Sequence, residues 1–358
     1  AIAIMNGTSQ VEILGTVTAD GNVTVTAENS IIGTEFTAKA GTAGIIGLGA
    51  AIAYMDVTGT TQIIIGDTGN ISGKNGVAGN AGLTVNVNPT ADGFAGGWAA
   101  AGLAAARLKV TGKTMIKTAP GSKLASERGN VALTAYQNLT AKAASKAAGL
   151  GYAGSAEASV ALVDVSSETS VDSAADVTAL NGSYNILAQQ ILTAQTDARG
   201  IGVAFGGSVG AAVARLKVKP VVSAVVTGGT IQAKNMNVRA LFNIADNSDY
   251  FNTGKLSADA YAGAAGLLIG GSGAYADVIF DGTTKAAVKN ANAVLTEDAL
   301  IFAKANGSAS ASGQGLSIGS LAVGGVVVKL SNTFKVLAQL VNSTLNRARN
   351  ISVLADYT

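Results

Sequence analysis

The sequence predicts an all-β parallel solenoid, and three observations lead to that fold class. Two blocks of residues recur at the same spacing along the chain, and both alternate with period 2, as strands do. The 358 residues include 46 glycines but only three prolines, with 13% charged and 48% apolar residues. Abundant Val, Ile and Thr argue against disorder, so we expect one repetitive β-domain over residues 1–358.

The first repeated block is a short alternating strand that usually ends in Ala. Residues 21–27 read GNVTVTA and residues 129–135 read GNVALTA. The copies end near residues 27, 88, 135, 188, 240, 303 and 355, and the copy at 88 lacks the final Ala. The spacings between these ends are 61, 47, 53, 52, 63 and 52, so the period is about 55 residues.

The second block is a Gly/Ala-rich run that ends in a longer apolar strand. Its copies occupy residues 50–57, 104–110, 159–165, 211–218, 274–280 and 325–330. A repeat of about 55 residues exceeds the roughly 20–30 residues of a usual solenoid coil. We therefore expect two coils per repeat, about a dozen coils in all, and a rod on the order of 50–60 Å long at ~4.7 Å per coil.

The Gly/Ala-rich strands are apolar or small on both faces. Along residues 46–53, Ile46 and Leu48 share one face, whereas Gly47 and Gly49 share the other. Such a strand is expected to be buried on both faces, or to lie flat against a second layer, with a thin core and no deep pocket. At the ends of these strands, charged residues are expected on a solvated outer face: Arg107, Lys109, Arg215 and Lys217.

Composition excludes several classes of function. The chain has no Cys and no His, which removes disulfides, thiolate metal sites and the commonest general base. A net charge of +2 indicates no nucleic-acid partner. The longest uncharged stretches, residues 41–55 and 260–276, consist mostly of small residues, so no membrane span is expected. Nucleophile-elbow, P-loop and zinc-protease motifs are absent, and we predict no catalytic, cofactor or metal residues.

Two segments contain residues of the kind that bind ions. Residues 270–277 are similar to a calcium-binding nonapeptide, but the pattern occurs once and Asp277 comes two positions late, so a buried Gly-rich strand is the favoured interpretation. Asp246 and Asp249 form an acidic turn that could coordinate a hard cation, although such clusters are more often Asx turns.

Carboxylates and one tryptophan raise the hypothesis of carbohydrate binding or cleavage. The carboxylates of Asp56, Asp164, Asp277 and Glu297 fall in different repeats, unlike those of a catalytic groove. Asp56 and Asp164, with Asp277 as a looser match, occupy related repeat positions, which predicts a structural ladder. Trp98 stands alone in its segment and could pack or offer a platform for sugar. We therefore expect the chain not to be an enzyme.

The alternation of Ala/Gly-rich strands with strands such as residues 21–27, without Cys or His, resembles filamentous-haemagglutinin-like adhesins, closest to the large leukotoxin-type filamentous adhesins. The resemblance covers residues 20–357. It implies a right-handed parallel β-helix, export to the cell surface or outer membrane of a bacterium, and a part in adhesion or matrix building.

The expected function is a stalk or scaffold segment of a secreted surface adhesin, whose partners would be a host-cell or matrix surface. An alternative is a fibre subunit that polymerises with copies of itself end to end. A carbohydrate-active enzyme is the third hypothesis. Because the chain starts without Met and lacks a signal peptide, we expect a processed chain or a fragment of a larger protein.

Overall fold

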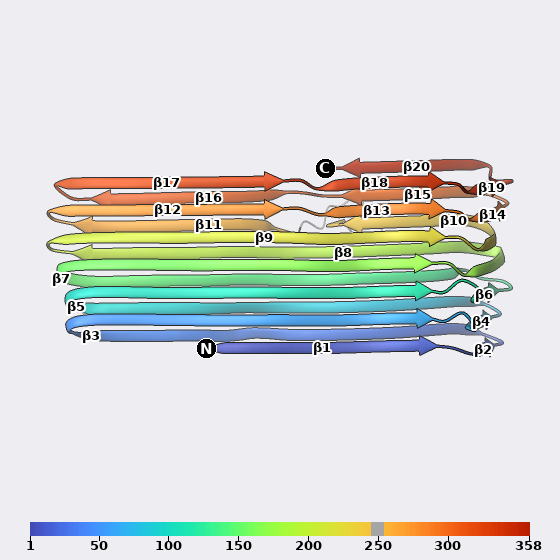
Figure 1. The fold of residues 1–358 in the computed structure, drawn as a ribbon, viewed down its shortest axis with the longest axis horizontal. Helices are drawn as coiled ribbons and strands as arrows, with labels where there is room; N and C mark the ends of the chain where they lie inside the picture. The colour runs from blue at the N-terminus through green and yellow to red at the C-terminus, as the bar shows by residue number, and fades with distance from the viewer. Residues whose placement is uncertain (245–253) are drawn as a thin grey trace.

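The computed structural model describes residues 1–244 and 254–358, and it confirms an all-β parallel solenoid (Figure 1). The strands that form the long walls are β1 (Ile2–Ile13), β3 (Asn22–Ile65), β5 (Gly76–Thr118), β7 (Val131–Ser173), β8 (Asp176–Ala204), β9 (Gly207–Thr227), β10 (Thr230–Phe242), β11 (Leu256–Gly266), β12 (Ile269–Phe280), β13 (Thr283–Lys289), β15 (Asp298–Ala305), β16 (Ala309–Ile318), β17 (Leu321–Asn332), β18 (Lys335–Val341) and β20 (Asn350–Tyr357). Short strands close one end of the coils: β2 (Thr16–Ala19), β4 (Asn70–Gly73), β6 (Lys123–Ser126), β14 (Asn292–Leu295) and β19 (Thr344–Asn346).

Each repeat forms one wide coil, so the predicted division into two coils per repeat is wrong. Ile2 pairs with Tyr54, and Ala99 pairs with Gly154, which places paired residues 52 and 55 apart along the chain. The coil has two long walls, because β3, β5 and β7 each run along one wall, turn, and return along the other, and short strands such as β4 join the walls at the opposite end (Figure 1). With seven levels the stack is about 30 Å high at ~4.8 Å per level, whereas a wall of about 20 residues measures roughly 65 Å. The molecule is therefore a plate rather than a rod.

The first repeated block forms a ladder of stacked alanines. Six of the seven predicted ends lie in one row, but the second lies at Ala81 and not at residue 88. The full row is Ala27, Ala81, Ala135, Ala188, Ala240, Ala303 and Ala355. The corrected spacings are 54, 54, 53, 52, 63 and 52. The long fifth spacing comes from an insertion between Phe242 and Leu256, because the pairing offset changes there from 52 to 62.

One half of every coil holds a conventional hydrophobic core. Met55, Leu83 and Leu108 point inward there and are fully buried. Tyr184 is also fully buried, and its hydroxyl donates a hydrogen bond to the Ser173 hydroxyl at 2.6 Å. Large side chains hold the two walls apart in this wide half.

The walls nearly touch in the other half of the coil. A methyl group on Gly49 would overlap the carbonyl oxygen of Phe94, and one on Gly93 would overlap that of Leu103. The expected thin core is therefore present. Burial on both faces is wrong, because the small residues face inward whereas Leu48, on the opposite face, is 67% exposed.

This close approach predicts a strong position dependence for Gly→Ala substitutions. Gly49→Ala places a methyl group against the opposing backbone and should lower the free energy of unfolding by about 1–3 kcal/mol. Gly273→Ala is the matched control, because nothing lies within 4 Å of its Cβ position, and it should be neutral or slightly stabilising. Urea unfolding of both variants checks this, and equal effects would contradict the close approach of the walls.

Candidate functional site

The narrow half of the coils forms an uncharged surface that we call the apolar wedge. It comprises residues 40–53, 93–106, 147–161, 200–214, 262–276 and 315–328. Each segment runs down one wall, around the tip and back along the other wall. Glu157 is the only charged residue in these segments.

Large apolar side chains project outward from both walls of the wedge. Leu48, Leu103 and Val209 are exposed on one wall, whereas Leu150 and Ile318 are exposed on the other. Alternation accounts for this arrangement, since the inward positions of the same strands are taken by Gly and Ala. A contiguous apolar surface exposed to water is unusual on a protein and marks a contact site.

The tip of the wedge carries a ladder of exposed aromatic side chains. The ring centroids of Trp98 and Tyr152 are 4.7 Å apart, and those of Tyr152 and Phe205 are 5.4 Å apart with nearly parallel rings. Trp98 therefore does not stand alone, because the coils stack it on residues that are distant in sequence. No sequence repeat marks these three aromatic residues, so the ladder was missed from the sequence.

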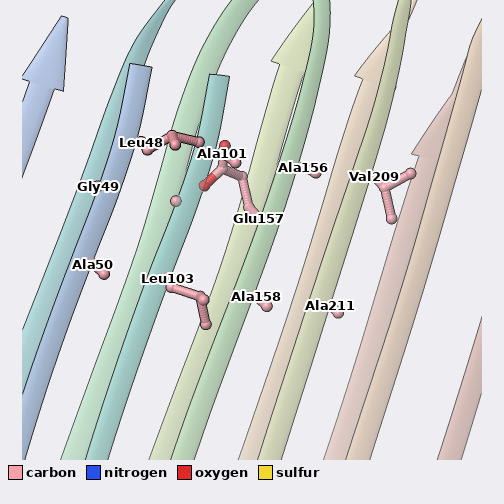
Figure 2. Close-up of a pocket in the computed structure, with 11 residues that line it drawn as sticks. Leu48, Gly49, Ala50, Ala101, Leu103, Ala156, Glu157, Ala158, Val209 and Ala211 are labelled. Carbon is pink, nitrogen blue, oxygen red and sulfur yellow. The ribbon is translucent and has the colours of Figure 1, made fainter. Parts of the chain in front are cut away.

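A shallow apolar depression of about 500 Å³ lies on one wall of the wedge (Figure 2). Its rim includes Leu48, Leu103 and Val209, and alanines such as Ala156 and Ala158 lie between them. The depression offers dispersion contacts and a single buried carboxyl group, that of Glu157.

Glu157 points inward between the two walls and is only 2% exposed. Its carboxyl group occupies space that two glycines leave free, since a methyl group on Gly102 or Gly149 would overlap it. Neither carboxyl oxygen has a hydrogen-bond partner among the described residues. Burial raises the pKa of Glu157 to about 7, and the nearby Gly102 backbone offsets part of this rise.

Glu157 has no catalytic partner in this position. Gly102 and Gly149 lie against its carboxyl group, and the inward hydroxyl of Ser155 is buried without a hydrogen bond among the described residues. A second titratable group at hydrogen-bonding distance would be needed for acid–base chemistry. The sequence could have indicated Glu157, because it interrupts an otherwise uncharged segment.

The charged residues at the strand ends lie on the outer face, as predicted, and form cross-coil rows. Asp56, Lys109, Asp164 and Lys217 follow one another in register, with Lys109 Nζ and Asp56 Oδ2 3.4 Å apart. This confirms a structural ladder for Asp56 and Asp164. Asp277 belongs to the neighbouring row, where its carboxylate lies 3.3 Å from the Arg215 guanidinium.

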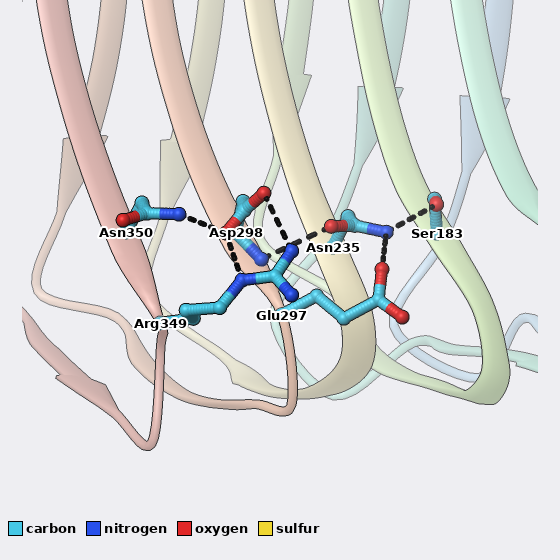
Figure 3. A network of polar contacts seen from close by, with 6 residues as sticks. All are labelled: Ser183, Asn235, Glu297, Asp298, Arg349 and Asn350. Atoms are coloured by element: carbon cyan, nitrogen blue, oxygen red, sulfur yellow. Dashed lines mark hydrogen bonds and ion pairs between the residues drawn. The ribbon is translucent and has the colours of Figure 1, made fainter.

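Glu297 belongs to a polar network at the wide end of the coils (Figure 3). The Asn235 side-chain amide donates to the Glu297 carboxylate at 2.8 Å. Arg349 donates two hydrogen bonds of 3.2 Å to Asp298, and Asn350 donates a third of 2.8 Å. These donors hold the pKa of Asp298 below its usual range. Because its members satisfy one another, the network fastens adjacent coils and is a poor site for catalysis.

The structure describes one of the two segments considered for ion binding. Residues 270–277 lie within β12, in agreement with the interpretation as a Gly-rich strand. Asp246 and Asp249 lie outside the described residues. Across residues 1–244 and 254–358, no three Asp or Glu side chains gather closely enough to hold a metal ion.

Burial of Glu157 predicts that stability depends on pH. The folded chain keeps this proton up to about pH 7, whereas the unfolded chain releases it near pH 4.5. The free energy of unfolding should therefore fall as pH rises from 4.5 to 7 and change no further above that. Glu157→Gln should remove this dependence and exceed the parent chain by on the order of 2–3 kcal/mol at pH 8.

Urea unfolding between pH 4 and 8 measures the effect. Ser155→Ala is the matched control, because it changes an inward polar side chain of the same strand without removing a charge. Its pH profile should run parallel to that of the parent chain. An unchanged pH profile in Glu157→Gln would contradict a buried, neutral carboxyl group.

Comparison with known proteins identifies no relative. No family model, no curated protein and no solved structure matches the chain. The resemblance to filamentous-haemagglutinin-like adhesins therefore stays a prediction from sequence motifs. Within the described part of the chain, no helix is long and apolar enough to cross a membrane.

Proposed function

We propose that this chain is a structural scaffold segment of a secreted bacterial surface protein of the adhesin type. The observation that carries the proposal is the continuous parallel stack, in which each coil is hydrogen-bonded along its length to the coils beside it. Such a stack is a stiff spacer, because its backbone bonds are formed between neighbouring coils over the whole width of the plate. The proposed location is the outer bacterial surface, with a host-cell or matrix surface as the partner.

The end coils are open, which supports continuation of the stack. In the last coil, and among residues 1–244 and 254–358, β17 pairs only with β12 and β20 only with β15. Inward apolar side chains of this coil, Val326, Val328 and Leu330, remain exposed. Unpaired strand edges beside exposed core favour addition of a further coil.

The same open ends favour a second candidate function, a fibre subunit that polymerises end to end. A further coil can come from the same polypeptide, as in a stalk, or from another copy, as in a fibre. Heterologous contacts of this kind build open filaments.

Substitutions in β17 test the two candidates. Val328 faces the coil interior and Val327 faces outward, and they are 46% and 48% exposed. If copies polymerise through their ends, electron microscopy of the isolated chain shows filaments, and Val328→Lys abolishes them because a charge enters the buried contact. Val327→Lys is the matched control and should preserve the filaments.

Each outcome decides between the candidates. Separate plates at all concentrations would support the stalk and exclude the fibre. Loss of filaments in Val327→Lys alone would contradict an end-to-end contact. Turnover of any member of a polysaccharide panel by the purified chain would overturn both structural proposals.

A further inference from the structure

The apolar wedge is uncovered on three sides, namely both walls and the tip. Leu48 and Leu103 project from one wall and Leu150 and Val203 from the other, with Trp98 at the tip. A flat protein surface could cover one wall and would leave the other in water. An occupant that surrounds the wedge removes all of this apolar surface from water at once.

Backbone hydrogen bonding decides whether the wedge can enter an environment without water. The strands of its four inner coils are hydrogen-bonded to the coils on either side, and turns at the tip are paired as well, whereas the outer edges at residues 40–53 and 315–328 are paired on one side only. The Gly206 amide donates to the Tyr152 carbonyl at 3.0 Å, and the Leu268 amide donates to the Gly206 carbonyl at 3.0 Å. Unpaired backbone groups are what exclude most irregular structure from lipid hydrocarbon.

Boundary rows of mostly polar residues close the wedge on both walls. Lys39, Asp92, Lys146, Arg199, Tyr261 and Gln314 form the row on one wall, and Tyr54, Arg107, Leu162, Arg215, Asp277 and Lys329 form the row on the other.

The composition of these boundary rows matches a lipid headgroup layer. Six members are cationic and two are acidic, an excess that complements phosphate groups. Two are tyrosines, the residue type enriched where protein meets the membrane–water interface. Arg107 lies over the Tyr54 ring at 5.8 Å, so cation and aromatic ring share one depth.

The wedge is deep enough to enter a bilayer and too short to cross it. From the boundary to the tip, the walls run from Tyr54 to Ile46 and from Arg199 to Phe205, eight and six residues. At ~3.3 Å per residue these lengths are about 26 and 20 Å, against roughly 30 Å for the hydrocarbon core.

From these observations we infer that the apolar wedge inserts into the hydrocarbon of a lipid bilayer, with the boundary rows at the headgroups. The occupant is lipid, because a fluid apolar medium can contact both walls and the tip together, and the cationic excess of the boundary rows complements headgroup phosphates. The alanine-floored depression of Figure 2 lies within the inserted part, where it can seat an acyl chain. The inference is independent of whether the coils form a stalk or a fibre.

The single tryptophan is a built-in probe, since Trp98 lies at the tip. The purified chain is mixed with phosphatidylcholine vesicles, and Trp98 emission is recorded together with flotation of the vesicles. Insertion should shift the emission to shorter wavelength and protect Trp98 from iodide in the water. Lipids brominated in their acyl chains should quench it.

Two double variants locate the contact. Leu48→Lys with Leu150→Lys places one charge on each wall of the wedge and should weaken partition at least about tenfold. Leu14→Lys with Leu180→Lys is the matched control outside the wedge, because Leu14 lies between β1 and β2 and Leu180 lies near the start of β8, and these leucines are 59% and 57% exposed. It should partition as the parent chain does, and circular dichroism confirms that both variants fold.

The remaining outcomes overturn the inference. Flotation with Trp98 still open to iodide would show adsorption at headgroups without insertion. A blue shift that follows protein concentration without lipid, and that brominated chains do not quench, would assign the wedge to a second copy. Equal partition of the two double variants would place the contact elsewhere, and absence of flotation would exclude lipid.

Discussion

The coil-to-coil backbone hydrogen bonds are the constraint on which the rest of this structure depends. They place equivalent residues directly above one another, so every inward position becomes a row of stacked side chains. A row whose members have one size holds the two walls at one separation from coil to coil. The alanine row from Ala27 to Ala303 is buried at every level, and this uniformity fixes the local separation of the walls.

The size of the inward residues then sets the thickness of the coil along its length. Rows with Met55, Leu83 and Phe280 hold the walls apart, whereas rows with Gly49 and Gly93 let them meet. A coil with so little volume at one end cannot bury large side chains there. The large apolar residues of these strands therefore face outward. The thin interior and the exposed apolar exterior of the wedge are two results of one alternating pattern.

Much of the fold could be predicted from the sequence because period and alternation are local signals. The repeat length, the strands and the thin core were predictable. The division into two coils was wrong because it assumed the usual coil of roughly 20–30 residues, whereas paired glycines such as Gly49 and Gly93 permit walls of about 20 residues each and hence a wider coil. The copy ending near residue 88 was misplaced because residues 82–88 alternate as well as residues 76–81 do, and alternation alone does not fix register.

The candidate site was less predictable, because its strands are apolar on both faces. The site depends on which of the two faces packs against the opposite wall. Alternation separates Leu48 from Gly49, yet it does not state which of them meets the opposite wall. The aromatic ladder of Trp98, Tyr152 and Phe205 joins residues about 54 apart that share no motif. The sequence marks Glu157 as unusual, because the segment around it is otherwise uncharged. Its raised pKa, however, depends on the two walls that bury it.

The stacking direction and the wedge direction are perpendicular, which bears on how the two proposals combine. Coils add along the vertical direction of Figure 1, and the wedge projects along the strands. Adding coils therefore lengthens the apolar edge without covering it. The apolar area available to lipid grows in proportion to the number of coils, whereas the entropy lost on binding a rigid body to a surface is incurred once. A long stack would thus bind a bilayer far more tightly than one plate, and it would lie along the membrane on its edge.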